Sequence, residues 1–445
     1  MHGTPLASAL VLLGFALPCA AAPTVTFLSS RAQTVKSVAL AANVVVNNCN
    51  DGGAGSLRQA VTDAGEGGLA DLTQLSCSKI SLSSELVVPH SKFSIVGPSD
   101  REVTISGSNQ TRVIAHTAGG AGVLTIQRLR IADGNYVTTG VARGGCIFSS
   151  AAVHLDKATV DNCLVQSRSD HADGGGMFAE GAAQLVESKI TGNRASAPSA
   201  YTAGGGVATT YGLILYRSEI SNNRAEGLGT CGGACIVGNY CSIVASTIAE
   251  NYSGYVVGGL GVYTPTIQII NSTISGNVAS LQVGGLQVSS GGYQPIIANS
   301  TIVLNNSAKF AGVYSTAAIR LYSSIVAQNT SSTPPILEDD FATYAVTDGA
   351  NNLVMSTSGT VPVKPGVIAL TVPPNLGPLS SNGGTTRTHL PQLGSPVIAA
   401  GSNKFAERFD QRGRGHPRSS SPQFPDMTDM GAVQFDTIFA DGDEP

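Results

Sequence analysis

One phrase recurs through the middle of the sequence: Gly-Gly, a short apolar run, a second apolar run, then Ser-x-Ile and an Asn three residues later. Five copies place their isoleucine at Ile190, Ile220, Ile248, Ile274 and Ile302, and the series continues to Ile325. The steps between these isoleucines are 30, 28, 26, 28 and 23 residues. A repeat of this length is typical of stacked supersecondary units, each of which contacts mainly its neighbours. The sequence therefore predicts a solenoid.

The repeating units are predicted to be built from strands. Leu213 and Leu215, like Ile267 and Ile269, lie two residues apart ahead of the Ser-x-Ile, and such pairs mark a strand with one buried face. A second short strand holds the isoleucine, and a third follows the Gly-Gly pair. The 53 glycines and the charged fraction of 12% suit short strands and tight turns. Three strands per coil predict an all-β fold, a right-handed parallel β-helix of about nine or ten coils.

The asparagine of each copy falls at the same turn in every coil. Its amide can bond the equivalent amide above and below, as in other stacks of identical strands, and Asn also tolerates a left-handed turn conformation. We interpret this row as a structural ladder rather than a binding site. The ladder comprises Asn193, Asn223, Asn251, Asn277 and Asn305.

Charged residues follow the same alignment. Lys157, Glu187 and Arg217 occupy one position of successive coils, and Lys189 and Glu219 occupy another. Opposite charges that stack on neighbouring strands lie within pairing distance. We expect exposed salt-bridge ladders here, each pair contributing a few tenths of a kcal/mol.

The chain is predicted to divide into a signal peptide (1–22), an N-terminal cap (40–79), the β-helix repeats (80–333) and a C-terminal cap and tail (334–445). An apolar run over residues 6–17, followed by small residues, is typical of a cleaved secretory signal. A short amphipathic helix starting after an N-cap at Ser56 would cover the first coil. No later apolar run approaches the ~20 residues that a membrane helix needs.

Seven cysteines remain after the predicted cleavage. An oxidising compartment would let six of them pair. We predict the pairs Cys49 with Cys77 and Cys146 with Cys163, and one bridge among Cys231, Cys235 and Cys241. A metal site is the competing interpretation of the last three cysteines, although no histidine lies among them to complete a tetrahedral set.

Several phrases outside the repeat belong together as a set. The C-terminal ones lie at 376–385, 388–390, 394–398, 410–413 (Asp-Gln-Arg-Gly) and 429–432 (Asp-Met-Gly-Ala), and the N-terminal ones at 48–51 (Asn-Cys-Asn-Asp) and 55–58 (Gly-Ser-Leu-Arg). Together they resemble the choice-of-anchor Q proteins, which are bacterial exported right-handed β-helix proteins. The resemblance implies a surface-displayed or secreted β-helix and no particular reaction. Asp410, Arg412 and Asp429 are open to two interpretations, a functional site or a buried clasp that holds the C-terminal cap closed.

One loop carries the residue types that catalysis needs. Arg168, Asp170, His171 and Asp173 precede the Gly-Gly of one copy and combine two carboxylates, an imidazole and a guanidinium. Hydrolysis of a glycosidic bond uses two carboxylates, and elimination needs a base near an acidic sugar, often with Ca²⁺ held by carboxylates. A polysaccharide lyase or glycoside hydrolase is therefore the alternative function. We expect no cofactor, with Ca²⁺ bound by these carboxylates as the alternative. A solvated polar loop is the structural alternative.

Tyrosines favour binding without chemistry, with stacking of their rings within the solenoid as the structural alternative. Ten of the twelve lie between residues 201 and 322, and the candidates for contact with a sugar or a protein are Tyr211, Tyr216, Tyr240, Tyr263 and Tyr293. The net charge of −4 and the lack of a basic stretch with aromatics argue against nucleic acid. We therefore expect an adhesive or glycan-contacting scaffold. We expect it to be secreted or held at the cell surface, with association with an outer membrane as one alternative. We expect it to be a monomer or to associate laterally with other copies.

Overall fold

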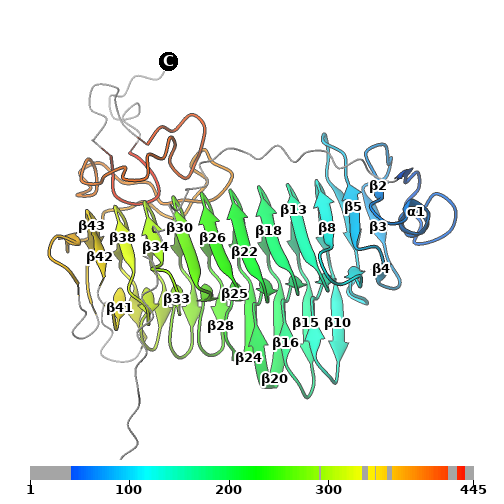
Figure 1. Ribbon diagram of the computed structural model, residues 1–445, viewed down its shortest axis with the longest axis horizontal. Helices are drawn as coiled ribbons and strands as arrows, with labels where there is room; N and C mark the ends of the chain where they lie inside the picture. The colour runs from blue at the N-terminus through cyan, green and yellow to red at the C-terminus, as the bar shows by residue number, and fades with distance from the viewer. Residues whose placement is uncertain are drawn as a thin grey trace, which may run out of the picture. The chain divides into compact units, whose positions relative to one another are not determined.

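The computed structural model describes residues 42–289, 292–332, 339–345, 347–357, 363–418 and 428–435, and the predicted signal peptide lies outside these residues. The described chain forms successive coils of short strands, and strands from neighbouring coils pair in parallel. Figure 1 shows the coils side by side along the long axis. The predicted parallel β-helix is therefore confirmed.

Three sheets enclose the core, and two of them contain twelve strands. Sheet A comprises β1 (Asn43–Val45), β2 (Leu69–Asp71), β5 (Lys92–Val96), β8 (Val123–Gln127), β13 (Ala152–Asp156), β18 (Ala182–Val186), β22 (Gly212–Tyr216), β26 (Tyr240–Val244), β30 (Thr266–Ile270), β34 (Ile296–Ala298), β38 (Arg320–Tyr322) and β42 (Asp348–Ala350). Sheet B comprises β3 (Lys79–Ser81), β6 (Val103–Ser106), β9 (Leu129–Ala132), β14 (Thr159–Asp161), β19 (Lys189–Thr191), β23 (Glu219–Ser221), β27 (Thr247–Ala249), β31 (Thr273–Ser275), β35 (Thr301–Val303), β39 (Ile325–Ala327), β43 (Asn352–Val354) and β44 (Ile368–Leu370). The stack is thus longer than the nine or ten coils expected.

The third sheet completes the section around the core. Sheet C comprises β4 (Leu86–Val88), β7 (Ile114–His116), β12 (Ile147–Ser149), β17 (Met177–Ala179), β21 (Val207–Thr209), β25 (Ala234–Val237), β29 (Leu260–Tyr263), β33 (Leu286–Val288), β37 (Val313–Ser315) and β41 (Phe341–Thr343). One helix, α1 (Leu57–Ala64), begins after Ser56, whose hydroxyl accepts from the backbone N–H of Gln59 at 3.2 Å. This N-cap satisfies one of the free amides of the first turn.

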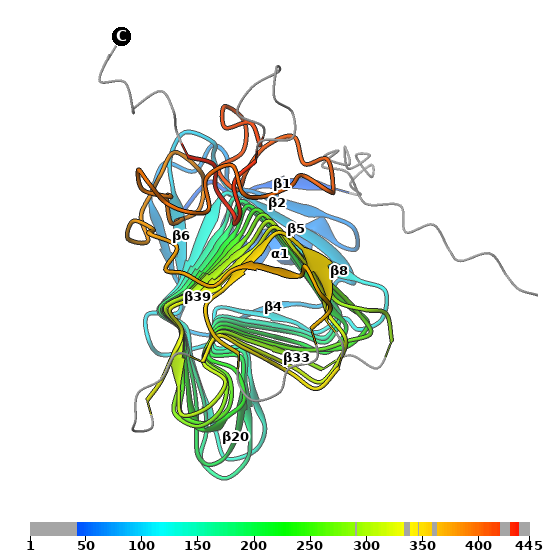
Figure 2. The ribbon, with the colours of Figure 1, turned by 90° about the vertical axis from the view of Figure 1, so that its left-hand side faces the viewer.

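A fourth sheet was not anticipated. Sheet D comprises β10 (Asn135–Thr138), β15 (Leu164–Ser167), β20 (Arg194–Ala203), β24 (Arg224–Gly229), β28 (Tyr252–Ser253), β32 (Val278–Ala279), β36 (Asn306–Ser307) and β40 (Thr330–Ser331), with β11 (Ala142–Arg143) and β16 (Ala172–Asp173) pairing beside β20. Figure 2 shows these loops leaving the three-sheet section and returning to it. We call this projection the fin. Its interior holds a small apolar cluster of its own, made of Ala142, Val165, Ala172, Ala195 and Ala197.

The register of sheet B matches the predicted stack at most positions. Ile190 pairs with Ile220, and Ile220 pairs with Ile248. The last step is different, because Ile302 pairs with Val326 whereas Ile325 continues the outward row. All three isoleucines of the stack are fully buried, and burying an aliphatic side chain contributes about 1.5–3 kcal/mol.

The asparagine row lies at the turn between sheets B and D. In Asn251, Nδ2 donates to Asn277 Oδ1 at 2.9 Å and to the carbonyl of Ile220 at 3.0 Å. The same bonding joins the five expected asparagines and continues through Asn329 to Asp340. The left-handed conformation belongs to the residue before the ladder position, as at Asn222 with φ 55°. The row therefore ties each coil to the next.

The salt-bridge positions lie at the turn between sheets A and B. Glu187 is 3.8 Å from both Lys157 and Arg217, as the alternation of charge predicts. The expectation for Glu219 is wrong, because this residue is only 7% exposed and pairs with Arg387 at 2.8 Å. Arg387 comes from the C-terminal part of the chain, which the repeat pattern does not describe.

The C-terminal segment (374–418 and 428–435) runs back along the outer face of sheet B. Thr247 Oγ1 donates to the carbonyl of Arg387 at 2.6 Å, and Thr273 Oγ1 donates to Gln411 Oε1 at 2.6 Å. Ser275 Oγ lies 2.8 Å from a ring nitrogen of His389. This segment, expected as an irregular cap, therefore covers a side of the solenoid over several coils (Figure 1).

Candidate functional site

Three of the four predicted catalytic residues lie together at the base of the fin. His171 Nδ1 is 2.8 Å from Asp170 Oδ1, and its Nε2 is 3.6 Å from Asp173 Oδ2. Arg168 is exposed, and no hydrogen bond or ion pair joins its side chain to another described residue. An imidazole thus lies between two carboxylates, apart from the guanidinium that the sequence suggested.

Local backbone geometry explains this arrangement. Alternate residues of a strand point to opposite faces. Ala172 is buried inside the fin, so His171 and Asp173 share the other face. Gly174 follows with φ 67°, and a Cβ there would lie 2.2 Å from the carbonyl oxygen of Met177. Only glycine fits this tight corner, which holds Asp173 against sheet C.

A different arginine completes the cluster. Arg143 pairs with Asp173 in register between β11 and β16, and its Nε lies 3.7 Å from Asp173 Oδ2. Its Nη1 lies 3.4 Å from Glu180 Oε1, and its guanidinium carbon lies 4.6 Å from the centre of the Phe178 ring. We call Arg143, Asp170, His171, Asp173 and Glu180 the fin-base cluster.

Sequence reasoning missed Arg143, Phe178 and Glu180. A signal was present, because Arg143 precedes Gly144-Gly145 as Asp173 precedes Gly174-Gly175. Aligning these two Gly-Gly pairs would have placed the arginine beside the aspartate.

The two aspartates experience opposite environments. Burial raises the pKa of Asp173, an effect that nearby His171 and Arg143 only partly oppose. Hydrogen bonds from the backbone and ring of His171 lower the pKa of Asp170. Groups whose environments push their pKa values apart are suited to act as acid and base. Asp170 thus favours the carboxylate form, and Asp173 favours the protonated form more than an exposed aspartate does.

A second arginine supports the cluster from the preceding coil. Arg112 pairs with Glu85 at 2.8 Å, and its Nη2 donates to the backbone carbonyl of Arg143 at 3.0 Å. Its guanidinium also lies 3.6 Å from the centre of the Tyr136 ring. Arg112 is 7% exposed, so its role is to hold β11 and thereby the backbone of Arg143.

The predicted binding tyrosines separate into two groups. Four of them occur where the chain passes from sheet C to sheet A, while Tyr216 ends β22 on the far side, where its ring centre lies 5.3 Å from the guanidinium carbon of Arg217. The sequence did not single out Tyr344, which lies at the same C-to-A passage and is 73% exposed. We call the following set the tyrosine edge: Tyr211, Tyr240, Tyr263, Tyr293 and Tyr344.

Members of the tyrosine edge differ in accessibility. The ring of Tyr240 covers Gly212, where a Cβ would lie 2.8 Å from the ring, and it meets Tyr211 edge-on with 6.0 Å between ring centres. Tyr263 is partly buried, and burial raises its pKa. Tyr211 and Tyr293 are 49% and 66% exposed. Tyr211, Tyr293 and Tyr344 are therefore the members available to a partner.

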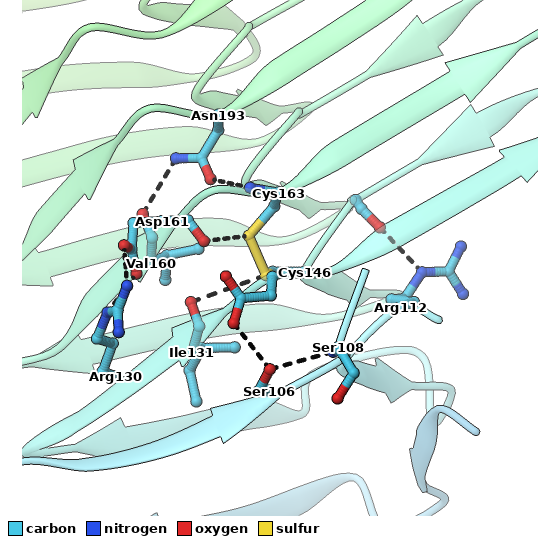
Figure 3. Close-up of a disulfide and its surroundings, with 12 residues drawn as sticks. Ser106, Ser108, Arg112, Arg130, Ile131, Cys146, Val160, Asp161, Cys163 and Asn193 are labelled. Carbon is cyan, nitrogen blue, oxygen red and sulfur yellow. Dashed lines mark hydrogen bonds and ion pairs between the residues drawn. A yellow bond between two sulfur atoms is a disulfide. The ribbon is translucent and has the colours of Figure 1, made fainter. Parts of the chain in front are cut away.

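The cysteines form bridges rather than a metal site. Cys49–Cys77 and Cys146–Cys163 are bonded as predicted, and Cys231 pairs with Cys235. Figure 3 shows the second bridge directly beside Asn193, whose Oδ1 accepts from the backbone N–H of Cys163 at 3.1 Å. The same figure shows Arg130 paired with Asp161 at 2.5 Å.

One of the three cysteines in this part of the chain forms no disulfide. Cys241 is free and buried, and burial raises its pKa to about 12. Across the described ranges, no group of three or more His, Cys, Asp or Glu side chains is placed to hold a metal ion.

The C-terminal acidic and basic residues form a buried clasp. Arg412 Nη2 contacts Asp410 Oδ2 at 2.7 Å, with side-chain exposures of 1% and 0%. Asp429 instead accepts from the backbone N–H of Ala399 at 2.8 Å. Arg418 is fully buried and donates to Asn271 Oδ1 and to the carbonyl of Gly431. Because these charges are inaccessible, they stabilise the C-terminal segment and offer no site for a substrate.

Comparison with protein-family models, curated proteins and solved structures finds no match to this chain. Within the described residues, no helix has the length and apolar character to cross a bilayer.

Proposed function

We propose that the protein is an exported β-helix scaffold that contacts an extracellular polysaccharide or another cell-surface component through its tyrosine edge. The observation that carries this proposal is the exposure of Tyr211, Tyr293 and Tyr344 along one side of the solenoid. A tyrosine offers a flat apolar ring and a hydroxyl that can hydrogen-bond, the combination that favours contact with a sugar. Repeat proteins use such extended rows of exposed residues for binding.

The coverage of sheet B by the C-terminal segment supports the same proposal. The outer face of sheet B is occupied by the chain's own C-terminal segment, which contacts Thr247, Thr273 and Ser275. No described segment covers Tyr293 or Tyr344 to a comparable degree, since both are more than half exposed. The chain covers sheet B with its own C-terminal segment and leaves this row of aromatic side chains exposed. Such an exposed row is suited to binding a separate partner molecule.

Export is part of this proposal. Three disulfides are compatible with an oxidising compartment, where exported proteins form and keep such bridges. We infer secretion or cell-surface display, and association with an outer membrane is a more specific form of the second possibility. The scaffold would act as a monomer or associate laterally, and the resemblance to choice-of-anchor Q proteins favours display.

Binding to a panel of neutral and acidic polysaccharides tests the proposal. Tyr293→Ala and Tyr344→Ala should each weaken binding about five- to tenfold, because each removes one stacking ring worth about 1 kcal/mol. Tyr201→Ala is the matched control, since Tyr201 is 62% exposed but lies on the fin. Absence of binding to every polysaccharide, or an equal loss in the control, would contradict the proposal.

Degradation of a polysaccharide is the second candidate function. The position of His171 between two carboxylates, beside Arg143, favours it. A lyase needs a base near an acidic sugar, whereas a glycoside hydrolase needs two carboxyl groups flanking the scissile bond. Among the described residues, no group of three or more His, Cys, Asp or Glu side chains is placed to hold calcium.

A further inference from the structure

The fin-base cluster contains an oriented base. An ionised carboxylate can only accept hydrogen bonds, so Asp170 fixes the ring hydrogen of His171 on Nδ1. The basic nitrogen is then Nε2, which faces Asp173. The His171 side chain is 36% exposed, so a substrate can reach it. This pairing of a base with an orienting carboxylate is the arrangement expected for proton abstraction.

The cluster also contains a group that can bind a carboxylate. Arg143 holds Glu180 at 3.4 Å, and the Glu180 side chain is 44% exposed. Exposed ion pairs contribute little, so an incoming carboxylate can replace Glu180 on the guanidinium. The carboxylate of a uronic acid residue would then lie beside His171 and above the ring of Phe178.

We propose that the fin-base cluster cleaves a uronate-containing polysaccharide by β-elimination, with His171 as the base, Arg143 as the carboxylate-binding group and Asp173 as the acid. This proposal rests on the second candidate function and names its substrate class and reaction. Asp170 is a positioning residue, because it acts through His171.

The reaction is balanced without water or an added reagent. The C5–H bond, which is α to the uronate carboxylate, breaks, and its proton moves to Nε2 of His171. The released electron pair forms a C4–C5 double bond, and the C4–O bond breaks. The leaving oxygen takes the proton of Asp173, whose burial favours the protonated form. His171 then returns its proton to Asp173 across the 3.6 Å separation, which restores the starting state.

Hydrolysis suits this cluster less well. A glycoside hydrolase places two carboxyl groups on opposite sides of the scissile bond, with space for water or a sugar carbon between them. Asp173 and Glu180 instead lie on the same guanidinium of Arg143. An imidazole base next to a guanidinium matches the removal of a proton α to a carboxylate.

Incubation of the full chain with polygalacturonate and with alginate tests the proposal. Elimination gives a conjugated, unsaturated product that absorbs in the ultraviolet, and each cleavage gives one new reducing end. His171→Gln and Asp173→Asn should lower the rate about 10²- to 10⁴-fold, the usual contribution of a general acid or base. Arg168→Gln is the matched control, because Arg168 lies in the same loop and its side chain forms no hydrogen bond or ion pair with the cluster.

Two variants separate catalytic roles from structural ones. Glu180→Gln should lower KM with little change in kcat, because it weakens the internal competitor for Arg143. Asp170→Asn should lower kcat with little change in KM, because an amide can donate as well as accept and so no longer fixes the ring hydrogen of His171 on Nδ1. A purely structural role for Asp170 would instead change kcat and KM together.

Three results would overturn the proposal. These are the absence of an ultraviolet-absorbing product from both polymers, reducing ends formed without absorbance, and full activity in His171→Gln. None of them affects the binding proposal, which depends on the tyrosine edge and is measured by the loss of affinity in Tyr293→Ala.

Discussion

Replacing Asn251 by alanine removes a central member of the asparagine ladder. Its Oδ1 accepts from both the backbone N–H and Nδ2 of Asn223 at 3.0 Å, and its Nδ2 donates to Asn277 Oδ1 and to the carbonyl of Ile220. Asn251 is 1% exposed, so water cannot replace these partners. The substitution therefore leaves two buried donor hydrogens of Asn223 without an acceptor, the backbone N–H and one hydrogen of Nδ2, while the other Nδ2 hydrogen keeps its bond to the carbonyl of Ile190.

The expected loss follows from these stranded groups. Each buried donor left unsatisfied costs about 1–3 kcal/mol, so Asn251→Ala should lower the free energy of unfolding by about 2–6 kcal/mol. The damage should be local, because coils of a solenoid contact mainly their neighbours. Urea denaturation gives the total, and amide hydrogen exchange should show loss of protection concentrated in β24, β28 and β32.

The neighbouring residue Asn222 provides a matched control. It is exposed and has φ 55°, and the one hydrogen bond of its side chain to a described residue is the 3.4 Å bond to Glu250. Glycine adopts this conformation readily, so Asn222→Gly should change stability by less than about 0.5 kcal/mol. A loss below about 1 kcal/mol in Asn251→Ala, or an equal loss in the control, would refute the reasoning.

Three further predictions concern the C-terminal segment and the first coils. Arg412→Met should cost about 3–5 kcal/mol in denaturant unfolding, because it leaves the carboxylate of Asp410 buried and unpaired; an unchanged midpoint would contradict the clasp. Burial lowers the pKa of His389 below its usual 6.5, so its contribution to stability is complete above pH 6.5 and is lost as pH falls. The amide protection factors of the C-terminal segment, which are exchange rates corrected for the intrinsic effect of pH, should be smaller at pH 5 than at pH 8, and larger factors at pH 5 would refute this sign. Cys146→Ser with Cys163→Ser opens a bridge that spans 17 residues and should cost about 3 kcal/mol, measured by the melting temperature against wild type.

The sequence predicted the stack well because its signals repeat. Ile190, Ile220 and Ile248 recur at nearly the length of one coil, and a buried position must be apolar in every coil. The one slip has the same physical basis. Ser324 is followed by Ile325 and Val326, two β-branched residues that are equally acceptable as the core residue, and only the ladder position at Asn329 distinguishes them.

The fin and the fin-base cluster were harder to predict. The cluster depends on which residues of neighbouring coils stack, and Arg143 and Asp173 are 30 positions apart in the sequence. The strands of the fin vary from two to ten residues in length, and their buried positions are mostly alanine, so their apolar periodicity is weak. Asp170, His171 and Asp173 could be selected by residue type alone, whereas Glu180 could not, because an exposed acid at a strand end has no local signature.

The residue types in an outward-facing row of a solenoid depend on whether another part of the chain covers that row. On sheet B the outward row passes from Lys189, which is exposed, to Glu219, which is almost fully buried and pairs with Arg387 of the C-terminal segment. It continues through Thr247 to Ile325, and both are fully or almost fully buried beneath the same segment. A charged side chain that is covered loses hydration and needs a partner such as Arg387, whereas a hydroxyl can bond the covering backbone. The tyrosine edge shows the opposite combination, large apolar rings that remain exposed. The tyrosine edge therefore lacks the charged residues of an exposed face and the small residues of a covered face. Such a row is suited to a partner that binds reversibly.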